Sequence, residues 1–146
     1  MHLAIVVNLL IKELLHSRLT VDHHGKINIM TSTKYTPEDI MQKVAVGKPF
    51  TLLILFAGDP VPDDDTVVNQ MQLAHLAHLF TMEDEGKCSI FGPISNHEEL
   101  HGIIVFNTVN KDEIHQWMAD DPYIKAGHLK YELYDWFTIP GQKIPG

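Results

Sequence analysis

Residues 50–57, FTLLILFA, form an apolar run in which Thr51 is the one polar residue. The run is too short for a core helix, and Gly58-Asp59-Pro60 ends it with residues typical of turns. A strand that is apolar at successive positions is buried on both of its faces. The fold must therefore cover two sides of a sheet, which already excludes a simple helical bundle.

The segments that follow predict the rest of the architecture. We expect a long helix that begins at the acidic residues 63–65 and ends before Gly86, strands over 87–91 and 102–107, a helix that begins with Asn110 and Glu113 as a capping box, and a strand over 129–133. The resulting order is β-α-β-β-α-β. This is the ferredoxin-like α+β arrangement, with two helices on one face of a four-stranded antiparallel sheet.

The second face of that sheet needs a cover. In the strand over 102–107, Ile103 and Val105 point to one side while Ile104 and Phe106 point to the other. Leaving a whole apolar face in water would create a large adhesive patch. We expect a homodimer in which two sheets form an α+β barrel, and the N-terminal segment is the alternative cover.

Composition limits the function classes. The 146 residues are 45% hydrophobic and 21% charged, which indicates one ordinary domain with a sizeable core. The net charge is −8 and no basic run occurs, so we expect no nucleic-acid partner and no anionic membrane partner. A small neutral or weakly charged substrate fits better. The single cysteine, Cys88, lies in a predicted strand and is expected to be a buried, inert thiol.

His75 lies on an apolar side of the long predicted helix. At about 100° per residue, it shares one arc with five apolar residues: Val67, Val68, Met71, Leu79 and Met82. A second apolar arc contains Leu73, Leu76 and Phe80, so we expect the helix to be covered from two directions. A histidine in such a place is either a core residue bonded to a main-chain carbonyl or an acid/base group.

The segment Asp121-Pro122-Tyr123 is the second chemical signal. It follows a short amphipathic helix, and its proline is expected to stop that helix. Asp121 is then either a solvated turn residue, a local cap, or the partner that orients His75 for proton transfer. Only the fold decides between these readings.

The N-terminal part is a separate question. We predict an extension over 1–47 and a domain with its C-terminal tail over 48–146. Residues 3–15 are compatible with an amphipathic helix, with a signal peptide, or with sequence upstream of a start at Met30. They are too short to span a bilayer, and we expect a cytoplasmic protein, export being the alternative. Thr36 and Pro37 predict a helix start, and Gly47 its end.

Taken together, these residues resemble the YCII-related proteins, a branch of the dimeric α+β barrel superfamily. The matching features are His75, the Gly92-Pro93 pair after the second strand, and Asp121-Pro122-Tyr123 with Gly127 before the last strand, and the resemblance extends over about 50–137. It implies a His75 and Asp121 acid/base dyad in a pocket between helices and sheet. Gly92, Pro93 and Tyr123 are then the candidate substrate-binding residues. The extension and the tail IPGQKIPG depart from the family pattern.

Two functions of different classes follow. Family members resemble lyases and isomerases, including enzymes that dehydrohalogenate hydroxylated aromatics, so one is a small-molecule lyase or isomerase that uses the dyad without a cofactor. The other is a non-catalytic domain that binds a small ligand. His78 lies one helical turn after His75, but two histidines alone make a poor metal site, so we expect no metal. His97, His101, His115 and His128 are expected to be solvated, and Trp136 and Phe137 to line the pocket or to pack in the core or interface.

Overall fold

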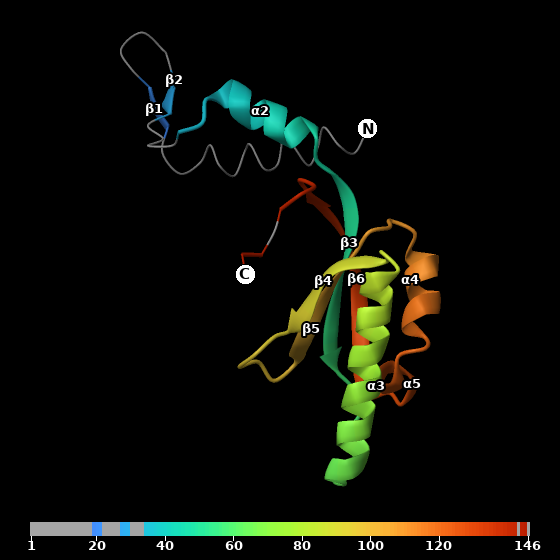
Figure 1. Ribbon diagram of the computed structural model, residues 1–146. Coiled ribbons are helices and arrows are strands. Elements are labelled where there is room, and N and C mark those ends of the chain that lie inside the picture. Colours follow the sequence, from blue (N-terminus) through green and yellow to red (C-terminus); the bar gives the residue numbers. More distant parts are fainter. Residues whose placement is uncertain (1–18, 22–26, 30–33, 143, 146) are drawn as a thin grey trace. The chain divides into compact units, whose positions relative to one another are not determined.

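A computed structural model describes residues 19–21, 27–29, 34–142, 144 and 145 (Figure 1). The chain divides into two compact units, Met1–Gln42 and Lys43–Gly146, and each is considered by itself. The predicted boundary after residue 47 stays a prediction. Within the described residues, no helix is both long and apolar enough to cross a membrane.

The first unit contains a short hairpin and most of a helix. β1 (Leu19–Val21) pairs antiparallel with β2 (Ile27–Ile29). α2 (Pro37–Ala45) begins as predicted: the Thr36 hydroxyl accepts a hydrogen bond from the Asp39 N–H (3.2 Å), and Asp39 Oδ2 accepts one from the Thr36 N–H (2.8 Å). The helix predicted over 3–15 lies outside the described residues.

The second unit has the predicted ferredoxin-like fold. Its elements are β3 (Lys48–Ala57), α3 (Asp65–Asp84), β4 (Cys88–Pro93), β5 (Leu100–Phe106), α4 (Lys111–Met118), α5 (Pro122–Lys125) and β6 (Leu129–Thr138). The four strands pair antiparallel in the order β4-β5-β3-β6. The apolar run therefore lies in a central strand, as its hydrophobicity on both faces requires.

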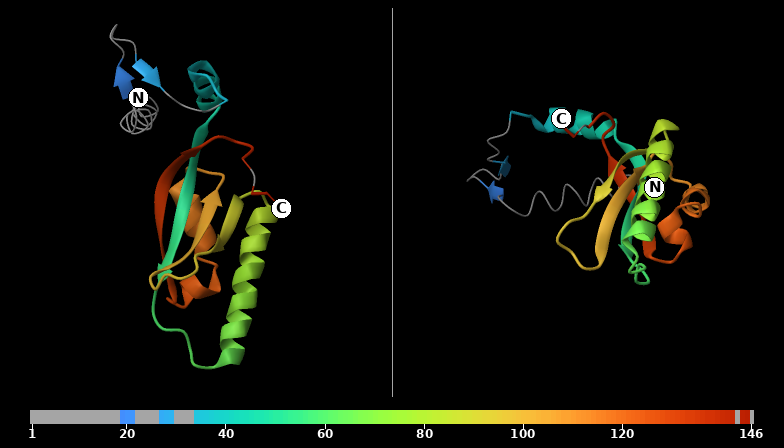
Figure 2. Two further views of the ribbon diagram at one scale, coloured as in Figure 1. Left: turned by 90° about the vertical axis from the view of Figure 1, so that its left-hand side faces the viewer. Right: turned by 60° about the horizontal axis from the view of Figure 1, so that its bottom comes forward.

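All three helices of this unit lie on one side of the sheet, as the right-hand view in Figure 2 shows. Alternate residues of β3 point toward them, and Leu53 and Leu55 are 0% and 5% exposed. Ile104 and Phe106 of β5 lie on the same face, because Leu53 is opposite Ile104 in the ladder. Leu79 and Met82 of α3 and Ile114 and Met118 of α4 complete this core.

The opposite face of the sheet is apolar over β3, β4 and β5, while β6 contributes Lys130 and Glu132 to it. Five apolar side chains of this face are half buried: Leu52, Ile54, Phe56, Ile90 and Ile103. Val105, opposite Leu52 on the same face, is buried. Ile54 lies opposite Ile103 on one side and Glu132 on the other, so it occupies the middle of the face. This is the face for which the amino-acid pattern predicts a second copy of the chain.

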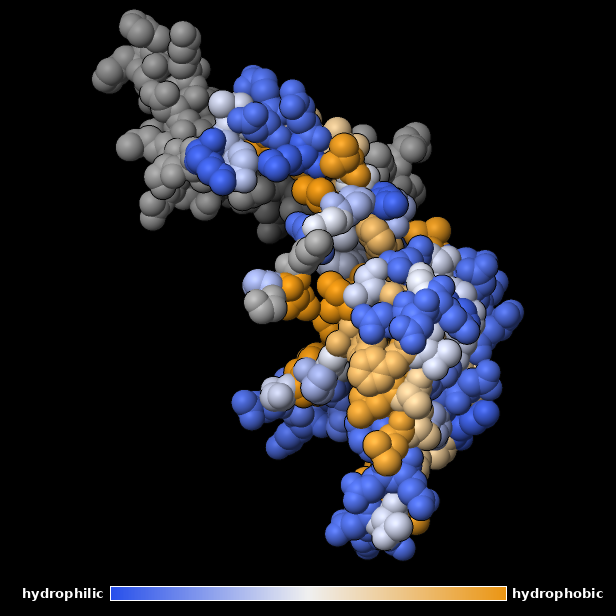
Figure 3. All heavy atoms as spheres, in the orientation of Figure 1, coloured by the Kyte–Doolittle hydropathy of each residue, from blue (hydrophilic) through white to orange (hydrophobic). Residues whose placement is uncertain are grey.

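Three local expectations differ from the structure. The second apolar arc of α3 is not covered: Leu73 is 69% exposed and Phe80 is 53% exposed, and apolar residues form a band along α3 in Figure 3. Pro122 does not only stop a helix; it is the first residue of α5, where its missing N–H costs nothing. Asn110 does cap α4, but Glu113 accepts from the Thr108 hydroxyl (3.2 Å), and no bond from Glu113 to the Asn110 N–H closes the expected box.

Cys88 is buried at the start of β4, with 2% exposure. Burial, and to a smaller extent the charge of Glu83, raises the pKa of its thiol from 9.0 to about 11. Because the folded state disfavours the thiolate, the folded protein is unaffected by this group below pH 9 and loses stability as the pH rises from 9 toward 11.

We therefore expect Cys88 to react slowly in the folded protein. At pH 8 the two-unit rise in pKa lowers the thiolate fraction about 100-fold, and the thiolate is the reactive form. Alkylation by iodoacetamide, followed by mass spectrometry with and without guanidinium chloride, measures the ratio of the two rates. Equal rates in the folded and unfolded chain would show that Cys88 is accessible and would contradict this assignment.

Candidate active site

The site is a cavity of about 700 Å³ between α3 and the sheet. Its walls are built from α3, from the ends of β3, β4 and β5, and from the segment that joins α5 to β6. None of the described residues that line it is Lys, Arg, Asp or Glu. The lining is largely apolar, and its polar side chains are those of Gln72, His75, His101, Tyr123 and His128.

His75 reaches this cavity from the buried side of α3 and is 8% exposed. The helix that carries it begins at Asp64, whose Oδ1 accepts from the Thr66 and Val67 N–H groups (2.8 and 3.4 Å). The predicted position of His75 among Leu79 and Met82 is confirmed, since these three are the buried residues of α3.

Asp121 lies directly behind the imidazole. Its Oδ2 is 2.6 Å from His75 Nδ1, and the carboxylate is completely buried. Its other oxygen, Oδ1, accepts from the N–H groups of Tyr123 (3.0 Å) and Ile124 (3.3 Å) and so caps α5. Because a carboxylate with these partners is an acceptor, the proton between the two residues belongs on His75 Nδ1. The ring nitrogen left for a ligand is Nε2.

Tyr123 of α5 contacts two residues of α3 that line the cavity, His75 and Gln72. Its ring contacts His75 edge to face, with 5.4 Å between ring centroids, and its hydroxyl donates to Gln72 Oε1 (3.2 Å). Burial, and secondarily the Asp121 charge, raises the pKa of the Tyr123 phenol above its ordinary value of 10.0. The phenol therefore stays protonated at neutral pH and acts as a hydrogen-bond donor.

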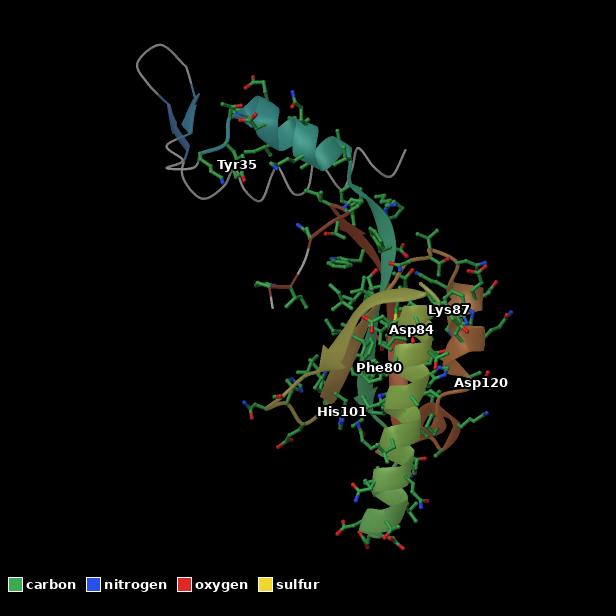
Figure 4. All side chains as sticks on the ribbon, viewed as in Figure 1. Tyr35, Phe80, Asp84, Lys87, His101 and Asp120 are labelled. Atoms are coloured by element: carbon green, nitrogen blue, oxygen red, sulfur yellow. The ribbon has the colours of Figure 1, made fainter. Side chains whose placement is uncertain are left out.

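Gly92, Pro93 and Tyr123, the predicted substrate-binding residues, all lie in the lining of the cavity. His101 and His128, expected to be solvated, lie there as well; His101 is the second residue of β5 and is labelled in Figure 4. Phe91 also contributes, and its ring contacts Phe80 at 5.4 Å. No periodic pattern in the sequence marks His128 as a residue of the lining.

The remaining predicted residues lie elsewhere. Trp136 and Phe137 are not among the lining residues of this cavity, and Phe137 packs against Gly47. His78 Nε2 is buried without a hydrogen-bond partner, the one such side-chain nitrogen or oxygen found among the described residues. In that same part of the chain, no three or more His, Cys, Asp or Glu side chains group together as a metal site would require.

A family model for the YCII-related domain matches residues 52–137. The chain belongs to the YCII-related domain family. The match covers the interval over which the resemblance was expected, and it contains His75, Gly92, Pro93, Asp121 and Tyr123. No curated protein matches the chain.

Two solved structures are similar to this YCII-related protein. Muconolactone isomerase is 14% identical, with a TM-score of 0.50 over 66% of this chain and 97% of that chain. The 5-chloro-2-hydroxyhydroquinone dehydrochlorinase from Burkholderia phenoliruptrix AC1100, in complex with 2,5-dihydroxybenzoquinone, is 22% identical, with a TM-score of 0.44 over 58% of this chain and 92% of that chain. The first of these similarities supports the ferredoxin-like α+β barrel fold.

Asp121 bonds both to His75 and to the first N–H groups of α5, and this predicts how its loss affects stability. Asp121→Ala removes both the cap of α5 and the partner of a buried imidazole, which together should lower the free energy of unfolding by about 2–4 kcal/mol. Asp121→Asn keeps a cap oxygen and should lower it by less than Asp121→Ala does. Denaturant titration measures all of these variants.

The adjacent Asp120 is the matched control for this comparison. Its side chain, labelled in Figure 4, is 76% exposed, and its one ion pair among the described residues is with the Lys125 ammonium group, at 3.3 Å. Exposed pairs of this kind contribute little to stability, so Asp120→Ala should have almost no effect. Equal losses in Asp120→Ala and Asp121→Ala would contradict the structural role of Asp121.

Proposed function

We propose that this YCII-related protein is a small-molecule enzyme of lyase or isomerase type that uses His75 and Asp121 as an acid/base dyad, without a cofactor. The observation that carries the proposal is the 2.6 Å contact between His75 Nδ1 and the buried Asp121 Oδ2 at the wall of a cavity large enough for a small molecule. A buried histidine with a buried carboxylate behind it is suited to proton transfer, because the carboxylate fixes the tautomer and orientation of the ring.

Within this proposal, each group has its own role. The Asp121 carboxylate accepts a hydrogen bond from His75 Nδ1–H. The lone pair of Nε2 therefore points away from the carboxylate. Nε2 takes a proton from an activated C–H bond of the substrate, and the electron pair of that bond remains on the substrate. The imidazolium that forms is balanced by the Asp121 charge, as in other His-Asp pairs.

The same first step serves both reaction types. In an isomerase, the imidazolium returns the proton to a different carbon. In a lyase, the electron pair forms a double bond as a leaving group departs with its own bonding pair, and the proton passes to that group or to water. Gly92 and Pro93 at the end of β4, together with Tyr123, would contact the substrate beside the dyad.

A substrate screen tests this function. The compounds are small hydroxylated, halogenated or lactone molecules incubated with the full chain in D₂O, and NMR scores both product formation and deuterium incorporation at carbon. A general base that removes a carbon-bound proton exchanges it with solvent, so exchange reports the first step even where no product accumulates. Binding without exchange or turnover across the set would favour the ligand-binding domain instead.

We also propose that the protein forms a homodimer through the sheet face opposite the helices. The five half-buried apolar side chains on that face support this assembly, since each fully buried side chain of this size contributes about 1.5–3 kcal/mol. Two such faces packed on each other would form the α+β barrel. Compartment stays a prediction.

A further inference from the structure

His128 is a second imidazole on the wall of the cavity that holds His75. It follows α5 and precedes the first residue of β6. The dyad does not use it, and its surroundings differ from those of His75 in one respect that matters chemically: the group behind its ring is a main-chain carbonyl and not a carboxylate.

The main chain holds His128 firmly in place. Gly127 has a φ of +77° and ends α5, and the His128 N–H donates to the Tyr123 carbonyl (2.9 Å) while the Gly127 N–H donates to Ile124 (3.1 Å). This pattern is a Schellman motif. The His128 carbonyl accepts from the Gly58 N–H (2.9 Å), and a Cβ at Gly58 would lie only 2.1 Å from the Gly127 oxygen. The turn therefore rests directly on the end of β3.

The side chain is fixed as well. His128 Nδ1 lies 3.1 Å from the Asp59 carbonyl oxygen, and the ring contacts the Tyr123 ring edge to face, with 6.4 Å between centroids. A carbonyl oxygen can only accept a hydrogen bond, so Nδ1 carries the proton. In the neutral ring, Nε2 is then an acceptor.

The rest of the lining indicates what this acceptor would meet. It contains no charged Lys, Arg, Asp or Glu among the described residues, and the rings of Phe91, Tyr123 and the histidines give it an aromatic character. Such walls favour a flat, uncharged ring. A ring of this kind forms a directed bond to His128 only if it carries a donor, for which a hydroxyl group is the simplest choice.

We propose that His128 is a specificity-determining residue, whose Nε2 accepts a hydrogen bond from a hydroxyl group of an uncharged aromatic ligand in this cavity. The assignment rests on the proposed function only in that the ligand is the molecule on which His75 acts. It concerns recognition, so it is tested by binding and not by turnover.

The probes are phenol and its methyl ether, anisole, which share a ring but differ in the hydroxyl donor. Affinities come from ¹H–¹⁵N NMR titrations of the full chain at pH 8, above the ordinary titration range of histidine. We expect the wild-type protein to bind phenol about five- to tenfold more tightly than anisole. Long-range ¹H–¹⁵N spectra should show the Nδ1–H tautomer of His128, with an Nε2 signal that shifts when phenol binds.

Two substitutions separate hydrogen bonding from packing. His128→Phe keeps a ring of similar size without an acceptor, and we expect it to bind the two probes equally. His128→Gln supplies an amide oxygen near the position of Nε2 and should retain most of the preference. The control is His115→Phe, since His115 lies on α4, contacts Tyr131 and is not part of the lining; it should behave as wild type.

The outcomes are distinct. Preference for phenol that persists in His128→Phe, or is lost equally in His128→Gln, would overturn the proposal, as would a wild-type protein that binds neither probe or both equally. If phenol preference depends on His128 while no substrate is ever turned over, the recognition assignment stands and the enzymatic proposal fails. If turnover depends on His75 but neither turnover nor phenol preference depends on His128, the enzymatic proposal stands and the recognition assignment fails.

Discussion

Replacing His75 by glutamine is expected to lower kcat/KM by about 10²- to 10⁴-fold for any substrate that the screen identifies, because positioned proton transfer contributes about that much. Glutamine preserves polarity and approximate size but cannot take up a proton. Asp121→Asn should also reduce turnover strongly, since an amide nitrogen at the position of Oδ2 cannot accept a hydrogen bond from Nδ1–H. Steady-state kinetics measure both effects, and circular dichroism checks that the variants fold.

Two controls accompany these variants. Asp120→Asn changes the neighbouring, exposed carboxylate and should leave kcat/KM unchanged. EDTA should also have no effect, because the proposed cycle moves protons between protein groups and substrate only. Activity that survives in both His75→Gln and Asp121→Asn would overturn the dyad, and activity lost on adding EDTA would direct attention to His75 and His78 as metal ligands.

Charging the middle of the open sheet face is expected to separate the dimer. The wild-type protein should sediment at twice its chain mass of 16.6 kDa, and Ile54→Asp at the chain mass. Ile54 lies between Ile103 and Glu132 in the sheet, so the new carboxylate would be desolvated at the centre of the interface. A penalty of about 3 kcal/mol or more corresponds to at least a roughly 100-fold rise in the dimer dissociation constant.

Leu73→Asp provides the matched control for Ile54→Asp. Leu73 is also a large apolar residue, but it is 69% exposed on α3, on the helical side of the sheet. The substitution should leave the sedimentation coefficient unchanged. A wild-type protein that sediments as a monomer, or an Ile54→Asp variant that remains dimeric, would contradict assembly through this face.

The elements that sequence reasoning predicts best are those with a strong periodic signal. The run over 50–57 becomes β3 with alternate residues buried, and the helix that carries His75 runs between Asp64 and Gly86 as its end signals indicate. Their order is sufficient for the ferredoxin-like topology. The strand ends are less accurate: β6 continues to Thr138, because its pairing with β3 over ten residues sustains a strand where alternation alone does not.

The site is predictable only where family resemblance adds to the residues. His75 and Asp121 are 46 positions apart, and no local pattern indicates that they meet. Asp-Pro is equally compatible with a helix stop and a helix start, which is why α5 was missed. His128 was expected to be solvated because a lone histidine after a glycine carries no periodic signal; its place in the cavity depends on contacts with Gly58 and Asp59, about seventy residues earlier.

One carboxylate, that of Asp121, both caps α5 and partners His75, and this limits how the site could diversify. A change at position 121 alters the chemistry and the helix start together, so the two properties cannot be adjusted one at a time. Position 128 is less constrained, because main-chain hydrogen bonds hold the turn around it whichever side chain it carries. New ligand preferences should therefore be reached through substitutions at 128, with the reacting pair left as it is.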